Sequence, residues 1–283
     1  MNLPNFIIIG AAKAGTTALY HYLGAHPAVF MSPIKETNYF AWEEALSLSD
    51  RKHLFPVSNI DDYTQLFESS ANATAIGEAS PLYLESPIAA YNIHQQIPKA
   101  KLIVSLRNPV ERAISGYLMH VRSGKINLDL NHQFTADEHY VNAGFYHENL
   151  NRFYDLFPRE NIHVSLYETF NKNPEKIIND LYSFVDVDTN FQPDLREKHN
   201  IGQVPKNPTL NKWLRNRKLK QLAQDYFPGF LKKAGKFILN KNMSARPDFS
   251  RETKLKLLEL YKQDIEKTQQ LTGLDLSQWL HFN

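Results

Sequence analysis

The segment Asn5–Thr17, NFIIIGAAKAGTT, decides the fold expected for this chain. Phe6–Ile9 is an unbroken apolar run, which is typical of a parallel strand covered on both faces. Gly10 ends the run, and nearly all the residues that follow it are small. The two threonines at the end of the segment open a predicted helix over Ala18–Ala25. The segment therefore predicts a strand, a tight turn and a helix start, which is the building unit of an α/β fold.

This turn has the features of a cradle for a phosphate-bearing nucleotide. A helix start carries unpaired N–H groups and the positive end of the helix dipole, and both attract phosphate. The small residues Ala14 and Gly15 leave the backbone open to a ligand, and Lys13 adds a full positive charge. The alternative is an ordinary strand–turn–helix in which Lys13 is incidental.

The turn differs from the P-loop of NTPases, G-x-x-x-x-G-K-[ST]. Its two glycines keep the P-loop spacing, but Lys13 precedes the second glycine and Thr16 occupies the lysine position. An NTPase also needs an Asp that holds magnesium at the end of a neighbouring strand. The second apolar strand, Lys101–Leu106, is followed by Arg107 instead. A cation at that place favours a phosphate bound without metal.

Composition limits the other classes of function. The chain has 283 residues, of which 42% are hydrophobic, so one domain over 1–283 is expected, with an α/β core to about 185 and a helical part after it. A net charge of +2 gives no indication of a nucleic-acid partner, and the lack of Cys excludes disulfides. No apolar run approaches the roughly 18 residues of a membrane span. Because the chain begins almost directly with a strand, we expect no signal peptide and a cytoplasmic location.

Strand and helix patterns alternate along the first two thirds of the chain. Strands are predicted at 28–31, 74–79, 101–106 and 162–166, and helices at 87–97, 109–124, 146–157, 175–184 and 251–271. The predicted fold class is α/β, a P-loop-like three-layer fold. Its central sheet is expected to be mostly parallel, with about five strands and helices on both faces, and the C-terminal third to be helical.

Two charged positions follow predicted strands. Glu36 comes after the short strand at 28–31 and beside aromatic residues, where a carboxylate is placed to act as a partly desolvated base. The alternative is a solvated Lys35–Glu36 pair. Arg107 ends a strand, and with Ser115 on the next helix it is placed to bind one phosphate; for Arg107 the alternative is a surface salt bridge. Two further arginines are expected at the surface, namely Arg112 and Arg122.

Three features stay open at this level. The segment Lys206–Met243 has ten Lys or Arg against one Asp, which fits either a basic surface for an anionic nucleotide, an acceptor or a membrane, or a solvated helical face. The helix at 251–271 has one apolar stripe, formed by Leu255, Leu258, Tyr261, Ile265 and Thr268. Several aromatic residues line an acceptor cleft or belong to the core: Tyr39, Phe40, Trp42, Tyr83 and Tyr146.

Four motifs together resemble the sulfotransferases that use 3′-phosphoadenosine 5′-phosphosulfate (PAPS). They are FIIIGAAKAGTTAL with LGAHP after it, KETNYF at 35–40, GEASPLY at 77–83 and LRNPVERAISGY at 106–117, and a weaker LDLSQW follows at 274–279. Their order and spacing are those of the family. The closest similarity is to the heparan-sulfate-like branch and its bacterial relatives, since KETNYF has no counterpart of the catalytic His of cytosolic aryl and steroid enzymes.

The resemblance implies roles for particular residues. The loop that holds the 5′-phosphosulfate consists of Lys13, Ala14, Gly15, Thr16 and Thr17. Arg107 and Ser115 bind the 3′-phosphate, Glu36 is the catalytic base, and Lys13 stabilises the leaving phosphate. PAPS is then the donor, adenosine 3′,5′-bisphosphate the product, and no metal takes part. The acceptor is a hydroxyl or amine of a glycan, glycolipid or small metabolite.

Two departures and two alternatives remain. Heparan-sulfate enzymes carry a Lys where this chain has Ala79, which weakens the case for a glycosaminoglycan acceptor. They also have a disulfide-bearing loop over the nucleotide, which a chain without Cys must replace, and the segment Lys206–Met243 is the candidate. The alternatives are a P-loop nucleotide kinase, which would need magnesium and ATP, and a non-catalytic nucleotide- or glycan-binding protein.

Overall fold

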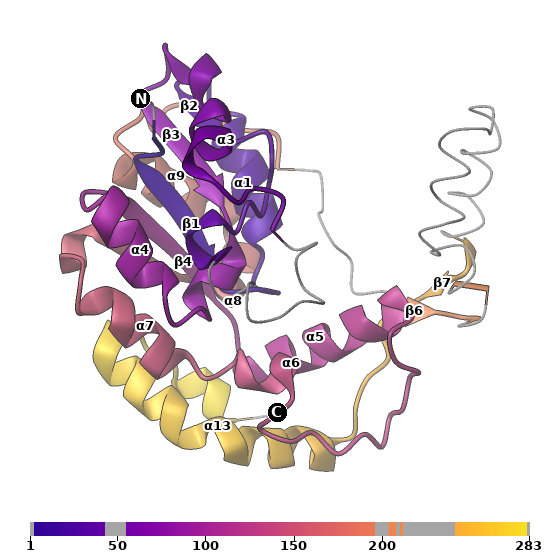
Figure 1. The fold of residues 1–283 in the computed structure, drawn as a ribbon. Helices are drawn as coiled ribbons and strands as arrows, with labels where there is room; N and C mark the ends of the chain where they lie inside the picture. The colour runs from indigo at the N-terminus through magenta and orange to yellow at the C-terminus, as the bar shows by residue number, and fades with distance from the viewer. Residues whose placement is uncertain (1–2, 43–54, 196–203, 208–209, 212–240, 282–283) are drawn as a thin grey trace. The chain divides into compact units, whose positions relative to one another are not determined.

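A computed structural model describes residues 3–42, 55–195, 204–207, 210–211 and 241–281 (Figure 1). The chain divides into two compact units. The first comprises Met1–Asn108, Phe145–His199 and Lys262–His281, and the second comprises Pro109–Gly144, Asn200–Tyr261 and Phe282–Asn283. The expected single domain over 1–283 stays a prediction.

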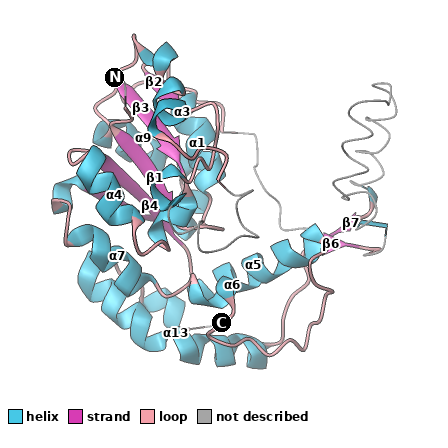
Figure 2. Cartoon of the chain, in the orientation of Figure 1, coloured by secondary structure: helices cyan, strands magenta, loops and turns pink. Residues whose placement is uncertain are grey.

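The first unit is built on a five-stranded sheet in the order β2-β3-β1-β4-β5. All four neighbouring pairs are parallel. The strands are β1 (Phe6–Gly10), β2 (Val29–Met31), β3 (Ala75–Ala79), β4 (Lys101–Leu106) and β5 (Ile162–Leu166) (Figure 2). Every residue of β1 is buried, as its unbroken apolar run predicted. The predicted fold class, a P-loop-like parallel sheet flanked by helices, is confirmed.

Helices lie on both sides of this sheet (Figure 1). One side carries a continuous apolar core, in which Phe6 and Ile8 of β1 pack with α1 (Thr16–Gly24) and α9 (Pro174–Phe184). Alternate strand residues point to opposite faces, so the side chains of Ile7 and Ile9 belong to the other side. The remaining helices of the unit are α3 (Ile60–Gln65), α4 (Ala89–Gln96), α7 (Tyr146–Tyr154) and α8 (Tyr167–Lys172), together with the short helices η1 (Tyr39–Ala41), η3 (Glu68–Ser70), η4 (Pro81–Leu84), η5 (Arg159–Asn161) and η6 (Ser277–Leu280).

The second unit contains α5 (Pro109–Ser123), α6 (His139–Asn142) and the antiparallel pair β6 (Val204–Pro205) and β7 (Met243–Ser244). The long helix α13 (Arg251–Thr272) begins in this unit, and its residues from Lys262 onward belong to the first. Ser250 caps α13, because its hydroxyl accepts a hydrogen bond from the Thr253 amide at 3.1 Å. The expected helical C-terminal third lies partly outside the described residues.

Two sequence predictions in the second unit are wrong. Arg112, expected at the surface, is only 1% exposed, and its guanidinium donates to the backbone carbonyl of Tyr140. A local pattern does not reveal this carbonyl, which lies 28 residues further along the chain. Leu255, expected on the buried stripe of α13, is 46% exposed, whereas Leu258 and Tyr261 are buried.

Most of the basic segment Lys206–Met243 lies outside the described residues. Among the described helices, none combines the length and the hydrophobicity that crossing a bilayer requires.

Candidate active site

The turn after β1 is fixed to the neighbouring strand β4. The Ala11 amide donates to the Ser105 carbonyl at 2.9 Å, and the Ser105 hydroxyl donates to the Ala14 carbonyl at 2.7 Å. Ser105 is buried and lies one residue before the end of β4. Two hydrogen bonds from one strand residue therefore hold both ends of the turn at the carboxyl edge of the sheet.

The turn needs an unusual backbone at two positions. Lys13 has φ 70° and Gly15 has φ 86°, which are left-handed values that side chains disfavour. Gly15 is also the N-cap of α1, so no side chain caps the helix, and its first turn has no acidic residue. The amides of Thr16 and Thr17 begin that turn and have no acceptor four residues earlier within the helix. The helix start therefore keeps its positive end open toward an anion.

Arg107 is joined to this turn. Its Nη1 donates to the Lys13 carbonyl at 3.1 Å, and its guanidinium lies over the Tyr167 ring at 4.8 Å. The Tyr146 hydroxyl donates to the Arg107 carbonyl at 2.8 Å and so fixes its backbone. The structure thus brings together Lys13 and Arg107, which lie 94 residues apart. Arg107 is half-buried and is bonded to the loop.

Ser115 lies on α5, in the second unit, and is half-buried. Its predicted role beside Arg107 stays a prediction.

Glu36 lies at the same carboxyl edge, beside β3. Its amide donates to the Ala79 carbonyl at 2.9 Å, and the Ser80 amide donates to the Ile8 carbonyl of β1 at 3.0 Å. The Glu36 side chain is 56% exposed and pairs with Lys35 at 2.6 Å. The expected partial desolvation is therefore wrong for this structure, because the carboxylate extends into solvent instead of packing on the aromatic residues. Its backbone φ of 63° is again left-handed.

Glu78, a fully buried carboxylate beside this loop, was not among the residues that the sequence indicated. It is 0% exposed and accepts hydrogen bonds from four hydroxyl groups, at 2.8 to 2.9 Å, namely those of Thr37, Tyr63, Ser80 and Tyr83. Burial raises the pKa of Glu78, and these hydrogen bonds act in the opposite direction. The motif GEASPLY contained the signal, an acidic residue inside a buried strand, but its partners come from other segments.

The five aromatic residues divide between two environments. Phe40, Tyr83 and Tyr146 are buried, so for these three the structure agrees with the alternative that they belong to the core. Tyr39 and Trp42 are half-buried, and the Tyr39 ring stacks on the Tyr63 ring with centroids 4.4 Å apart. Of the five, only these two keep surface for a ligand.

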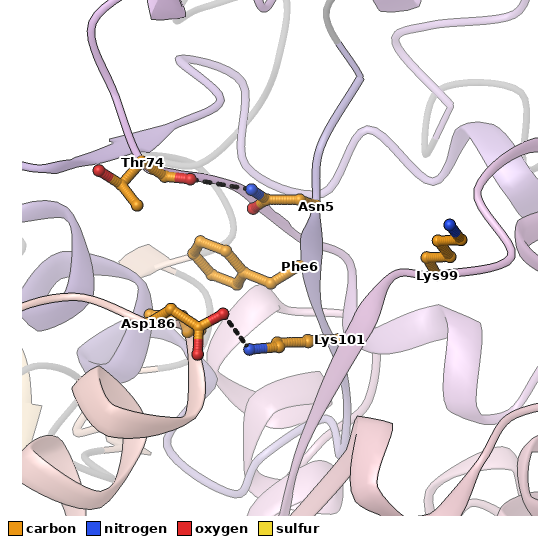
Figure 3. A pocket seen from close by; sticks show the side chains of 7 residues that line it. Asn5, Phe6, Thr74, Lys99, Lys101 and Asp186 are labelled. Carbon is orange, nitrogen blue, oxygen red and sulfur yellow. Dashed lines mark hydrogen bonds and ion pairs between the residues drawn. The ribbon is translucent and has the colours of Figure 1, made fainter.

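A cavity of about 130 Å³ lies elsewhere in the first unit, at the amino ends of β1 and β4 (Figure 3). It is lined by Asn5, Phe6, Thr74, Lys99, Lys101, Val185 and Asp186. Lys101 pairs with Asp186, and the side-chain Nδ2 of Asn5 donates to the Thr74 carbonyl. None of the predicted site residues lines this cavity. Among the described residues, no group of His, Asp or Glu side chains is arranged to hold a metal ion.

Comparisons with known proteins agree with the resemblance of the motifs. The sequence model of the Sulfotransferase domain matches residues 3–270. The chain is 38% identical over 128 residues to the membrane-associated sulfotransferase kil1 of Dictyostelium discoideum, covering 44% of this chain and 25% of that protein. It is 27% identical over 207 residues to the human bifunctional heparan sulfate N-deacetylase/N-sulfotransferase 2, covering 65% of this chain and 22% of that protein.

One solved structure is similar over its whole length. The crystal structure of a sulfotransferase from Alicyclobacillus acidocaldarius has a TM-score of 0.73 and 25% sequence identity, and the match covers 99% of this chain and 100% of that one. By contrast, the chain spans about a quarter of the two curated relatives above. Since the domain model covers residues 3–270 and the bacterial enzyme shares the fold, this chain belongs to the sulfotransferase family.

Proposed function

We propose that this protein transfers a sulfuryl group from PAPS to a hydroxyl or amine of a glycan, a glycolipid or a small metabolite. The observation that carries the proposal is the junction of two cationic residues at the carboxyl edge of the sheet, where the Arg107 guanidinium bonds the Lys13 carbonyl. Open α/β sheets bind their ligands at this edge. A nucleotide with phosphate groups at both its 5′ and 3′ positions needs two separate positive centres, and we assign the start of α1 with Lys13 to one and Arg107 to the other.

The residues of the turn suit the 5′-phosphosulfate. The uncapped start of α1 offers amide donors, and Lys13 offers a full positive charge. Arg107 suits the 3′-phosphate because a guanidinium donates two parallel hydrogen bonds to phosphate oxygens. By the resemblance of the motifs, Ser115 adds a hydroxyl to that phosphate. These positive groups meet the charge of the nucleotide without a metal ion.

Glu36 is the proposed base. Its carboxylate takes the proton from the acceptor hydroxyl or amine as the acceptor atom bonds to sulfur and the bond between sulfur and the 5′-phosphate oxygen breaks. Lys13 stabilises the negative charge that the leaving oxygen gains. The exposure of Glu36 suits an acceptor that arrives from solvent, and general-base help of this kind contributes about 10²–10⁴-fold to the rate.

The acceptor class is proposed from the relatives. Two of them are named for carbohydrate and heparan sulfate, so glycans are the first class to test. The human carbohydrate sulfotransferase 15 is 33% identical over 168 residues, covering 47% of this chain and 30% of that protein. By the resemblance of the motifs, heparan-sulfate enzymes carry a Lys at the position of Ala79. Because this chain lacks that Lys, non-sulfated and amine-bearing acceptors should be tested beside sulfated ones.

Isothermal titration with adenosine 3′,5′-bisphosphate in the presence of EDTA tests the nucleotide assignment. We expect binding that Lys13→Ala and Arg107→Ala each weaken by about tenfold or more, since each removes a charged contact to phosphate. Lys99→Ala is the matched control, because Lys99 lines the separate cavity. Binding of ATP only with magnesium would favour a kinase, and bisphosphate binding with full turnover in Glu36→Gln would remove the proposed base.

A further inference from the structure

The buried carboxylate of Glu78 organises the backbone that carries Glu36. Its Oε2 accepts from the Thr37 hydroxyl at 2.8 Å and the Ser80 hydroxyl at 2.9 Å. Its Oε1 accepts from the Tyr63 hydroxyl at 2.9 Å and the Tyr83 hydroxyl at 2.8 Å. Each oxygen of a carboxylate can accept two hydrogen bonds, and both oxygens of Glu78 do so here.

These hydroxyl groups in turn hold the loop after Glu36. The Ser80 hydroxyl accepts from the Asn38 amide at 3.1 Å, and the Tyr83 hydroxyl accepts from the Phe40 amide at 3.4 Å. Thr37, whose side chain reaches Glu78 directly, is the residue next to Glu36. The loop over 36–40 is thereby attached at three places, to Glu78 of β3, to Ser80 just after β3 and to Tyr83 of η4.

The loop needs this attachment because its backbone is strained. Glu36 has φ 63° and Asn38 has φ 52°, both in the left-handed region. Such conformations are costly for residues other than glycine and persist only where surrounding contacts impose them. Thr37, between the two, is 0% exposed and bonded to Glu78. The strained residues therefore flank the residue that is bonded to the buried carboxylate.

We propose that Glu78 is a positioning residue for Glu36, acting through the hydroxyl group of Thr37. The proposal rests on the proposed function, in which Glu36 is the base. Burying a carboxylate is costly unless it is fully hydrogen-bonded, and an apolar residue would fill the same space at less cost. What the carboxylate provides and an apolar residue does not is a fixed place for the loop, and with it a fixed direction for the Glu36 side chain.

Two isosteric variants separate positioning from a purely structural role. Thr37→Val and Tyr63→Phe each remove one hydroxyl that donates to Glu78, from the loop in the first case and from α3 in the second. Thr37→Ser keeps the hydroxyl and serves as the rescue. Turnover is measured as release of adenosine 3′,5′-bisphosphate from PAPS, with water and with de-N-sulfated heparin as acceptors. Bisphosphate affinity and hydrogen exchange of the peptide at 32–42 are measured in parallel.

We expect Thr37→Val to lower kcat by about 10- to 100-fold, because small displacements of a reacting group cost rates of this order. The affinity for bisphosphate should stay within about twofold, and exchange at 36–40 should become faster. Thr37→Ser should recover kcat to within about threefold of the wild-type value. The kcat of Tyr63→Phe should also stay within about threefold of the wild-type value. Equal losses of kcat in Thr37→Val and Tyr63→Phe would overturn the proposal.

The two proposals fail in different ways. A wild-type protein that does not bind the bisphosphate refutes the proposed function, whatever the variants do. A wild type that binds and turns over while Thr37→Val keeps both its kcat and its slow exchange at 36–40 refutes the positioning role alone. Loss of bisphosphate affinity in Thr37→Val with kcat unchanged would also refute it, since positioning of a base acts on turnover.

Discussion

At Gly15, the backbone and a neighbouring ring impose two separate demands on one residue. Its φ of 86° is left-handed, and an added Cβ would lie 2.9 Å from the Tyr167 ring. Gly273 has φ 74° but no atom within 4 Å of an added Cβ, so it isolates the first demand. We expect Gly273→Ala to lower the free energy of unfolding by about 1–2 kcal/mol.

Gly15→Ala should lower the free energy of unfolding by about 1–3 kcal/mol more than Gly273→Ala does, because the added methyl group displaces Tyr167. Since Tyr167 supports Arg107, bisphosphate affinity should fall in this variant and not in Gly273→Ala. Urea denaturation and titration measure both effects. Equal losses of stability in the two variants would mean that Tyr167 moves aside freely and does not hold the loop.

Single residues also show where reasoning from the sequence stops. Lys13 and Arg107 were predicted to belong to one site because each follows a strand, and strand ends of a parallel sheet meet at one edge. Glu78 was given no role, and Arg112 was placed at the surface. Charged residues are rarely buried, and the partners of these two are distant in sequence. Thr37 lies 41 residues from Glu78, and no local pattern links them.

At the scale of elements, strands were predicted more accurately than the contacts between helices. β4 and β5 have the predicted bounds, and β1 extends one residue beyond its apolar run. Continuous apolar runs mark buried parallel strands, whatever the rest of the fold does. The stripe of α13 was predicted less well, since Leu255 is exposed, because helix periodicity indicates a face but not how far its neighbours cover it.

The start of α7 depends on a carboxylate from another helix. Asp264 of α13 accepts hydrogen bonds from the Tyr146 amide at 2.8 Å and the His147 amide at 3.2 Å. It therefore acts as an N-cap supplied by α13, and Tyr146 in turn bonds the Arg107 carbonyl. Asp264→Ala should lower the free energy of unfolding by about 1–2 kcal/mol, as measured by urea denaturation, because the cap is lost.

The contribution of Asp264 to the free energy of unfolding should depend on pH. Burial raises the pKa of Asp264 above its ordinary value of 3.8, and the hydrogen bonds from the Tyr146 and His147 amides oppose that shift. A raised pKa means that the folded state holds its proton longer than the unfolded state does. The contribution of Asp264 is then fully present below about pH 4 and is lost as pH rises through the raised pKa.

The measurement compares the wild type with Asp264→Asn by urea denaturation between pH 4 and pH 8. The difference in free energy of unfolding, wild type minus variant, should decrease as pH rises and then become constant. Glu266→Gln, which removes an exposed carboxylate from the same helix, is the control for the change of net charge. A difference that increases with pH would show that the amide hydrogen bonds outweigh the cost of burial.

At the scale of the whole molecule, three separate segments form the first unit, and the order of the chain did not predict this. Residues 145–199 and 262–281 join the first 108 residues, while the residues between them form the second unit. The parallel sheet follows from its apolar runs, but the return of the chain depends on contacts such as that between Asp264 and the start of α7. Such contacts become visible only in three dimensions.

A ligand that binds only the folded state should raise the free energy of unfolding of the whole part of the chain that unfolds cooperatively. At a bisphosphate concentration 100 times Kd, linkage predicts about 2.7 kcal/mol of added stability, which raises Tm by several degrees for a chain of this size. We expect this shift in EDTA, and we expect Lys13→Ala and Ser115→Ala to reduce it. Added salt should also reduce it, because screening weakens the attraction of the positive groups for phosphate.

Adenosine 5′-monophosphate, which lacks the 3′-phosphate, is the matched ligand for the same scan. If Arg107 binds the 3′-phosphate, Arg107→Ala should bring the Tm shift with bisphosphate down to that with the monophosphate and leave the monophosphate shift unchanged. A variant that loses both shifts equally would place Arg107 with the 5′-phosphate or with the loop itself. The bond from Arg107 to the Lys13 carbonyl makes that second outcome a real physical alternative, so comparing the two ligands decides which phosphate Arg107 binds.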